Sequence, residues 1–177
     1  MIWIKKYKNM RMKNTKFDIE KFLDLSDYAT ETRKSRRKNN KNGKNTAEFF
    51  TPYSIVQKMC NKVPEETWRD PEKTFLEPCF GNGNFVCYII WNRLQHGIDW
   101  KTTLENLYGV ELMQDNVEET KKRVHEMLGE ICEDDYNHEV AENIMKTHLV
   151  CSDFFDWNFE EWRPFTEEEK KNIKKKK

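Results

Sequence analysis

Along residues 46–151, segments with the apolar spacing of a helix alternate with segments that have the apolar pattern of a strand. The first predicted helix lies within 46–63, with Thr51 as its cap and Pro52 in its first turn. Four apolar residues at three- and four-residue intervals would form its buried face: Ile55, Val56, Met59 and Val63.

Short apolar runs and longer amphipathic segments alternate further along the chain. The runs predict strands at 74–77, 107–112 and 148–151. Helices are predicted at 84–97 and at 113–128, the second burying Val117, Val124, Met127 and Leu128. Asp99 would cap a short helix, and an acidic loop would precede the third strand. This alternation predicts an α/β protein with a partial parallel sheet and flanking crossover helices.

The first 45 residues differ in charge from the rest. They hold 14 basic and 5 acidic side chains, which leaves 17 basic and 26 acidic ones for the remainder. A helix is predicted at 16–33, followed at 33–45 by a flexible linker without an apolar residue. We therefore expect a basic N-terminal arm (1–45), a folded domain (46–160) and a charged C-terminal tail (161–177), with Met1 or Met12 as the start.

The basic arm is a candidate for contact with nucleic acid, because clustered lysines and arginines attract phosphates whatever the base sequence. The candidate residues are Arg33, Lys34, Arg36, Arg37 and Lys38. A disordered, solubilising tail would have the same composition, so both interpretations stay open.

The stretch FLEPCFGNGNFV, residues 75–86, places two glycines where a strand should turn into a helix. Gly81 and Gly83 can take positive φ, and they leave room for a ligand beside the free N–H groups of the next helix. The pattern lacks the last glycine of the dinucleotide fingerprint, which Val86 replaces. An ordinary tight turn would use the same two glycines.

Each predicted strand is followed by, or ends in, an acidic residue. Glu77 precedes Pro78, Glu111 closes YGVEL, and Asp153 follows the third strand in LVCSDFF. The carboxyl ends of parallel strands meet at one edge of a sheet, where nucleotide-binding folds hold ribose hydroxyls. The three acids therefore predict a ligand site at that edge.

Taken together, these segments resemble the N6-adenine DNA methyltransferases of restriction-modification systems. FLEPCFGNGNF is similar to the family's cofactor loop, and EFFTP (48–52) to the segment that closes over the methionine end of the cofactor. LYGVEL resembles the ribose-binding strand, and CSDFF the segment beside the adenine. The resemblance covers about residues 46–157 and implies a Rossmann-like methyltransferase fold that binds S-adenosylmethionine.

The resemblance implies a role for each matching residue at the methionine end of the cofactor. Thr51 and Pro52 would border the methionine moiety. Glu77, Gly81 and Gly83 would shape the pocket and meet the amino-acid end.

At the adenosine end, Glu111 would accept hydrogen bonds from the ribose hydroxyls and Leu112 would pack on the adenine. Asp153 would accept from the adenine amino group, with Phe154 beside the ring. Pro78, which follows Glu77 at the mouth of the pocket, is also a candidate cofactor-binding residue.

The family's catalytic motif, a polar residue followed by Pro-Pro and an aromatic, is not present. Only the lone Pro164 of WRPF precedes an aromatic, and no polar acceptor or strand leads into it. A polar C-terminal helix and tail is the better interpretation of 161–177. The catalytic residues are therefore unassigned, and the sequence describes a cofactor-binding half.

Three functions remain open. The first is adenine-N6 methylation of DNA, completed by a second subunit that supplies catalytic and target-recognition parts. The second is a non-catalytic module that binds S-adenosylmethionine, nucleic acid through the arm, or both. The third is methylation of another acceptor, such as RNA or protein, because cofactor and fold do not determine the acceptor.

Cysteine usage and hydropathy bear on the setting of the protein. Five cysteines occur without a C-x-x-C pair, and no secretory signal precedes them, which indicates a reducing, cytoplasmic location. Cys132 and His138 have no zinc-site spacing, so no metal is predicted. No apolar run approaches the length of a membrane span.

Overall fold

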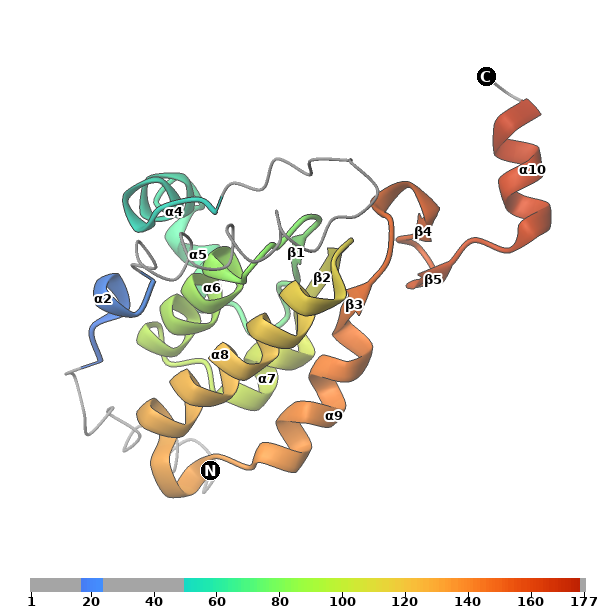
Figure 1. Cartoon of the computed structure of the whole chain (residues 1–177). Helices are drawn as coiled ribbons and strands as arrows, with labels where there is room; N and C mark the ends of the chain where they lie inside the picture. The colour runs from blue at the N-terminus through green and yellow to red at the C-terminus, as the bar shows by residue number, and fades with distance from the viewer. Residues whose placement is uncertain (1–16, 24–49, 176–177) are drawn as a thin grey trace, which may run out of the picture.

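Three parallel strands form the central sheet of the protein (Figure 1). The computed structural model describes residues 17–23 and 50–175. Strand β1 (Phe75–Glu77) pairs with β2 (Leu107–Glu111), and β2 pairs with β3 (Leu149–Cys151). The order β1-β2-β3 follows the chain, and the parallel α/β arrangement predicted from the sequence is confirmed.

Helices connect the strands and cover the sheet. They are α6 (Asn84–Gln95) and α7 (Trp100–Glu105) before β2, then α8 (Gln114–Cys132), the short 3-10 helix η1 (Glu133–Asp135) and α9 (His138–His148) before β3. Because parallel crossovers are right-handed and the strand order does not reverse, α6 and α8 lie on one face of the sheet, in front of it in Figure 1. Helices α4 (Tyr53–Cys60) and α5 (Glu65–Arg69) precede β1 and pack against α6.

Several predicted local signals are confirmed. The carboxylate of Asp99 accepts a hydrogen bond of 2.9 Å from the Thr102 N–H and caps α7. Gly97 has a φ of +84° just after α6, as expected of a glycine that ends a helix. The four residues expected inside the 113–128 helix, now part of α8, are all buried: Val117, Val124, Met127 and Leu128.

The prediction for the first helix is wrong in part. In α4, Val56 and Cys60 are buried, whereas Ile55 and Met59 are 43% and 53% exposed. Helix α4 packs chiefly against α6, so only a narrow stripe of its surface is covered. Pro52 occupies the cap position itself, and no side chain caps the helix, so Thr51 is not its cap.

The acidic segment before β3 is not the loop that its composition predicted. Helix α8 continues to Cys132, and α9 begins at His138, capped by the Asn137 side chain on the Val140 N–H. The structure buries Ala141 and Met145 of α9 completely or nearly so. The high mean polarity of this segment is typical of a loop, but the segment forms a helix with a narrow apolar stripe.

Residues 19–23, which charge counting assigned to the N-terminal arm, lie in the core. They form the short helix α2 (Ile19–Leu23), which packs against α6 and buries Ile19 and Leu23. A helix of five residues is not stable alone, so tertiary contacts hold it in place. The rest of the predicted 16–33 helix lies largely outside the described residues.

The C-terminal segment forms a small hairpin and one further helix. After the 3-10 helix η2 (Phe154–Asp156), strands β4 (Trp157–Asn158) and β5 (Arg163–Pro164) pair antiparallel, and α10 (Glu167–Lys175) follows. Figure 1 shows α10 standing apart from the sheet and its covering helices. The polar C-terminal helix predicted from composition is therefore present, whereas the hairpin was not predicted.

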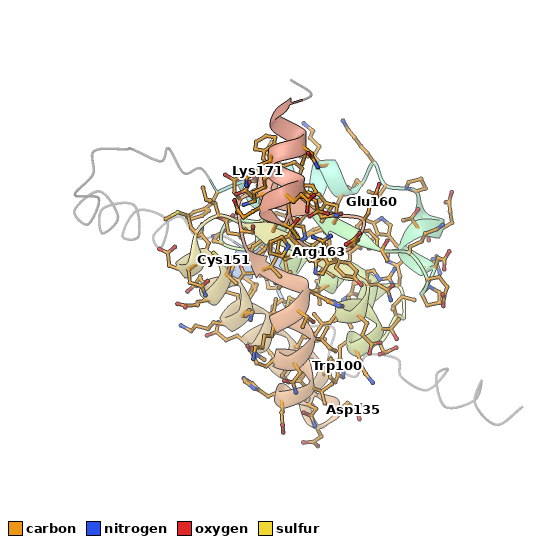
Figure 2. The ribbon with its side chains drawn as sticks, turned by 90° about the vertical axis from the view of Figure 1, so that its right-hand side faces the viewer. Trp100, Asp135, Cys151, Glu160, Arg163 and Lys171 are labelled. Atoms are coloured by element: carbon orange, nitrogen blue, oxygen red, sulfur yellow. The ribbon has the colours of Figure 1, made fainter. Side chains whose placement is uncertain are left out.

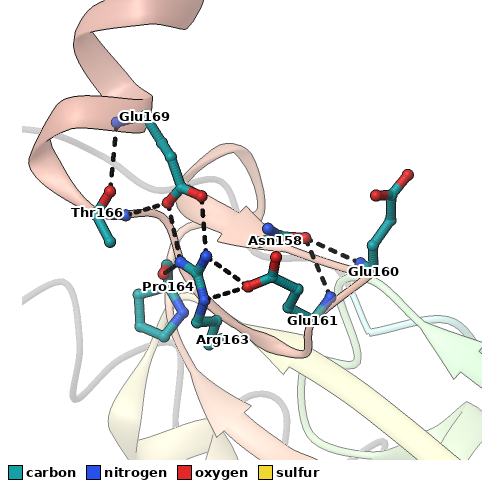
Figure 3. A network of polar contacts seen from close by, with 7 residues as sticks. All are labelled: Asn158, Glu160, Glu161, Arg163, Pro164, Thr166 and Glu169. Atoms are coloured by element: carbon teal, nitrogen blue, oxygen red, sulfur yellow. Dashed lines mark hydrogen bonds and ion pairs between the residues drawn. The ribbon is translucent and has the colours of Figure 1, made fainter.

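Charged side chains fasten α10 to the hairpin (Figure 3). The Arg163 guanidinium donates to both carboxylate oxygens of Glu169 at 2.9 Å and also pairs with Glu161. Glu169 in turn accepts from the Thr166 N–H, and its own N–H donates to the Thr166 hydroxyl, which is a capping box. Arg163, and then Thr166, lower the pKa of Glu169 to about 2.

At the end of the molecule opposite to α10, an aromatic contact joins α7 to the segment between α8 and α9. Figure 2 shows Trp100 and Asp135 far from Arg163 and Lys171. The Trp100 indole donates to the Asp135 carbonyl at 3.0 Å, and its ring meets Tyr136 edge-on. This contact ties α7 to the turn between α8 and α9, on the side of the sheet away from the strand ends considered next.

Candidate functional site at the carboxyl edge of the sheet

The three acids predicted to share one edge do converge there. The pKa of the Cys79 thiol is raised, first by desolvation and then by the carboxylates of Glu111, Glu77 and Asp153. One exposed sulfur therefore lies within electrostatic reach of all three. Because parallel strands bring their carboxyl ends together, residues separated by 34 and 42 positions in the chain become neighbours.

The loop of residues 78–83, called the glycine loop from here on, has the backbone that the sequence predicted. Gly81 has a φ of +53° and Gly83 a φ of +86°, both in the left-handed region. A Cβ on Gly83 would lie 2.6 Å from Thr120 Cγ2 of α8. The packing of the loop on α8 therefore requires that residue 83 has no side chain.

Phe80 anchors the glycine loop to the sheet. Its side chain is buried, and a Cβ on Gly109 of β2 would lie 2.6 Å from the Phe80 ring. The large Phe80 side chain is thus accommodated by a glycine in the neighbouring strand. This pairing of Phe80 with Gly109 is a long-range contact that no local pattern reveals.

Glu111 connects β2 to the glycine loop. Its side chain is 8% exposed, and one carboxylate oxygen accepts from the Gly81 N–H at 2.8 Å. The other oxygen accepts from the Met113 N–H at 2.9 Å and from the Asn116 amide at 3.4 Å. A carboxylate offers about four lone-pair positions, so Glu111 retains capacity for a ligand hydroxyl.

Glu77, at the end of β1, is partly buried. Desolvation raises the pKa of its carboxyl group, and a weak hydrogen bond from the Cys79 N–H at 3.4 Å opposes this rise. An ionised carboxylate in such a place is stabilised by a cation that enters the site. Glu77 is therefore suited to receive a positively charged group of a ligand.

Apolar surface lies next to the acids at the ends of β2 and β3. Leu112 is 59% exposed and Phe154 is 36% exposed, although both are large hydrophobic residues. Asp153 accepts from the Phe155 N–H at 2.8 Å through one oxygen, which orients its carboxylate at the start of η2. Exposed apolar groups beside an exposed carboxylate suit a flat heterocycle that carries an amino group.

The described part of the closing segment, residues 50–52, lies against the glycine loop. The Thr51 carbonyl accepts from the Asn84 amide at 2.8 Å, and the Phe50 ring lies within 3.6 Å of an ideal Cβ position on Gly81. A backbone contact of Thr51, and not a helix cap, thus holds this segment beside the glycine loop.

A stripe of buried polar residues on α8 forms hydrogen bonds to the glycine loop and to Glu111. These residues were not among those predicted for the site. Asn116, Thr120 and Arg123 are one helical turn apart and at most 3% exposed. Asn116 reaches Glu111, the Thr120 hydroxyl donates to the Gly81 carbonyl at 3.2 Å, and Arg123 donates to the Asn82 carbonyl at 2.5 Å. A signal for these residues is present in the sequence: each lies next to, or one helical turn from, the apolar residues Val117, Val124 and Met127 that face the core.

Asn82, inside the glycine loop, carries an unsatisfied donor. The residue is 2% exposed, and its amide nitrogen has no hydrogen-bond partner in the described part of the chain. A buried, unpaired amide is costly, which makes it a candidate contact for a ligand acceptor. The sequence signal was its position between the two glycines.

Other predicted residues are not brought to the site. Arg33, Lys34, Arg36, Arg37 and Lys38 lie outside the described residues, so contact with nucleic acid stays a prediction. Pro164 of WRPF lies in β5, where the preceding arginine is held by Glu161 and Glu169. The WRPF segment thus has a structural role in the hairpin.

Comparisons with protein families, with curated proteins and with solved structures find no match for this chain. Within residues 17–23 and 50–175, no group of three or more histidine, cysteine or acidic side chains is arranged to hold a metal ion. No helix in the same ranges has the length and apolar character needed to cross a membrane.

Proposed function

We propose that the chain is an S-adenosylmethionine-binding domain of the N6-adenine DNA methyltransferase type, with a Rossmann-like fold. The observation that carries this proposal is the buried Glu111 carboxylate, which holds the glycine loop through the Gly81 N–H and, with three donors bound, retains about one free lone-pair position. An acid at the end of the second strand is the group that accepts from ribose hydroxyls in nucleotide-binding α/β sheets. The strand order β1-β2-β3 supports the same proposal, since it corresponds to one half of a doubly wound sheet.

The methionine end of the cofactor would lie between the glycine loop and the closing segment. Its ammonium group suits the partly buried Glu77, and its carboxylate suits the unpaired Asn82 amide and the first N–H groups of α6, which have no acceptor within the helix. Thr51 and Pro52 would border this end, and Pro78 would form part of the wall.

The adenosine end would lie over the ends of β2 and β3. Glu111 accepts from the ribose hydroxyls, Leu112 and Phe154 cover the faces of the adenine, and Asp153 accepts from its amino group. The site thus offers an acceptor to the ribose and an acceptor to the adenine amino group, and two exposed hydrophobic residues become covered.

The bound cofactor supplies an activated methyl group, and we propose adenine in DNA as its acceptor. The sequence has no Pro-Pro-aromatic motif, so we place the acceptor-binding residues on a second polypeptide. Within the described residues β1 is an edge strand, and its Leu76 is 48% exposed, so this edge is a surface on which such a subunit would dock. Methyl transfer to DNA by this chain alone, or no methyl transfer with any partner, would contradict this part of the proposal.

The experiment that tests cofactor binding is isothermal titration of the full chain with S-adenosylmethionine. Glu111→Gln removes the charge at nearly constant shape, and Asp153→Asn does the same at the other end of the site. Each change should weaken binding by roughly 10- to 100-fold, the effect of one hydrogen bond to a charged group. Glu72→Gln is the control, because Glu72 is exposed on the turn before β1. A folded wild-type protein that does not bind the ligand would refute the proposal.

A further inference from the structure

Three segments that are far apart in the sequence meet at one buried side chain, Arg123 of α8. Its guanidinium donates to the Asn82 carbonyl at 2.5 Å and to the Asn84 side-chain oxygen at 2.9 Å. It also donates to the Phe22 carbonyl of α2 at 3.4 Å and lies 5.2 Å from the centre of the Phe22 ring. One residue therefore contacts the glycine loop, the start of α6 and the N-terminal helix.

The contact network extends from Arg123 to the closing segment. Asn84 accepts from Arg123 through its side-chain oxygen and donates through its nitrogen to the Thr51 carbonyl at 2.8 Å. Since an amide side chain has a fixed geometry, the position of Arg123 determines which way the Asn84 nitrogen points. Both walls of the site, the glycine loop and residues 50–52, thus depend on the same guanidinium.

The energetics of this arrangement suggest that it serves position more than stability. Arg123 is 3% exposed, and no carboxylate of the described residues forms an ion pair with it. A buried charge that only neutral oxygens solvate is costly, and a hydrophobic residue of similar volume often stabilises a fold at least as well. What an apolar side chain cannot do is orient several acceptors at once, as the planar guanidinium does.

Helix α2 is held by the same residue and has little stability of its own. It is five residues long, and its attachment consists of buried Ile19 and Leu23, the Phe22 contact and the hydrogen bond to Arg123. Undocking α2 would remove one acceptor and the aromatic ring from the guanidinium and open it to water. The side chain would then have new rotamers available, and the loop would lose its fixed support.

We propose that Arg123 is a positioning residue of the cofactor site, and that the docking of α2 and the binding of S-adenosylmethionine are coupled through it. The coupling to ligand rests on the proposed function, whereas the coupling between α2 and the glycine loop does not. Coupling is reciprocal, so bound ligand should stabilise the docked helix as much as the docked helix favours the ligand. Helix α2 is then able to influence the site through Arg123.

The first test is hydrogen exchange on the full chain without ligand, comparing Phe22→Ala and Arg123→Met with the wild type. Phe22→Ala should speed exchange not only in 19–23 but also at the Gly81 and Gly83 amides, by about tenfold. The control is Lys122→Met, an exposed residue one position away on α8. Unchanged exchange in the glycine loop of Phe22→Ala or Arg123→Met would overturn the proposal.

The second test adds S-adenosylmethionine to the same proteins. Ligand should slow the exchange of the 19–23 amides in the wild type and in Lys122→Met, and this response should vanish in Arg123→Met. Arg123→Lys keeps the charge but not the planar fork, so its affinity for the ligand should lie closer to that of Arg123→Met than to that of the wild type. Equal affinity in wild type and folded Arg123→Met would refute the coupling to ligand. If the wild type itself does not bind, the proposed function fails, and the ligand-free exchange still decides whether Arg123 couples α2 to the loop.

Discussion

Substitution of Gly83 by alanine should reveal how tightly the glycine loop is packed on α8. Two costs add in the folded state. A φ of +86° costs an L-residue roughly 1–2 kcal/mol, and the new Cβ would lie 2.6 Å from Thr120 Cγ2 and 2.7 Å from its hydroxyl. Thr120 is fully buried and its hydroxyl is bonded to the Gly81 carbonyl, so it has little freedom to move. Overpacking of this kind costs roughly another 1–3 kcal/mol.

The chain offers a matched control at Gly97. Its φ of +84° is nearly the same, but a Cβ there would meet nothing within 4 Å. Gly97→Ala should therefore incur only the backbone cost, and Gly83→Ala should lower the free energy of unfolding by about 1–3 kcal/mol more. Urea denaturation followed by tryptophan fluorescence measures both.

A double mutant separates the steric cost from the backbone cost. Thr120→Ala removes the two atoms nearest to the new Cβ, so the loss in the double mutant should be smaller than the sum of the two single losses. Equal destabilisation by Gly83→Ala and Gly97→Ala, or additive losses in the double mutant, would show that the loop is not packed against α8 as described.

Three further predictions follow from other contacts. Burial raises the pKa of Glu77 above its ordinary value of 4.5, so its ionised form destabilises the fold. Glu77→Gln should therefore increase the free energy of unfolding at pH 7. This increase should disappear as the pH falls below about 4.5, where the Glu77 carboxyl is protonated in the folded and the unfolded protein. An increase that persists at pH 4 would show that the charge of Glu77 is not its cause. Asp99→Ala should cost about 1 kcal/mol, because it removes the cap on the Thr102 N–H; loss of less than 0.3 kcal/mol in urea titration, roughly the error of such a measurement, would argue against the cap. Burial raises the pKa of Cys60 and of Cys132 to about 11. In the native protein at pH 8, both thiols should therefore react with an aromatic disulfide far more slowly than they do in urea. Rapid labelling of the native protein would count against their burial.

The local signals in the sequence were sufficient for most of the secondary structure around the site. Three strands, α6, α8 and the Asp99 cap could be predicted because each depends on residues within a few positions of one another. The prediction failed where a helix has little apolar surface. Composition predicts a loop where α9 forms. Periodicity predicts a buried face of α4 that is correct for Val56 but wrong for Ile55 and Met59, because it does not say which neighbour a helix will meet.

The acids of the site could also be predicted from the sequence, but the support of the site could not. Glu77, Glu111 and Asp153 each stand at the end of a strand, and parallel pairing brings strand ends together without further information. The site is supported by contacts of Arg123, Asn84 and Phe80 with residues tens of positions away in the sequence. The residues next to them in the sequence do not predict those contacts.

By itself, the sequence determined the order of the three strands, the helices α6 and α8, the positive-φ glycine turn and the placement of three carboxylates at one edge. These properties follow from backbone conformation and side-chain periodicity, which are local. Only the tertiary structure decided that Gly83 is small because of Thr120, that Thr51 serves through its carbonyl, and that α2 belongs to the core. Each of these depends on which side chains come into contact after folding, and packing and buried hydrogen bonding are determined by the whole chain at once.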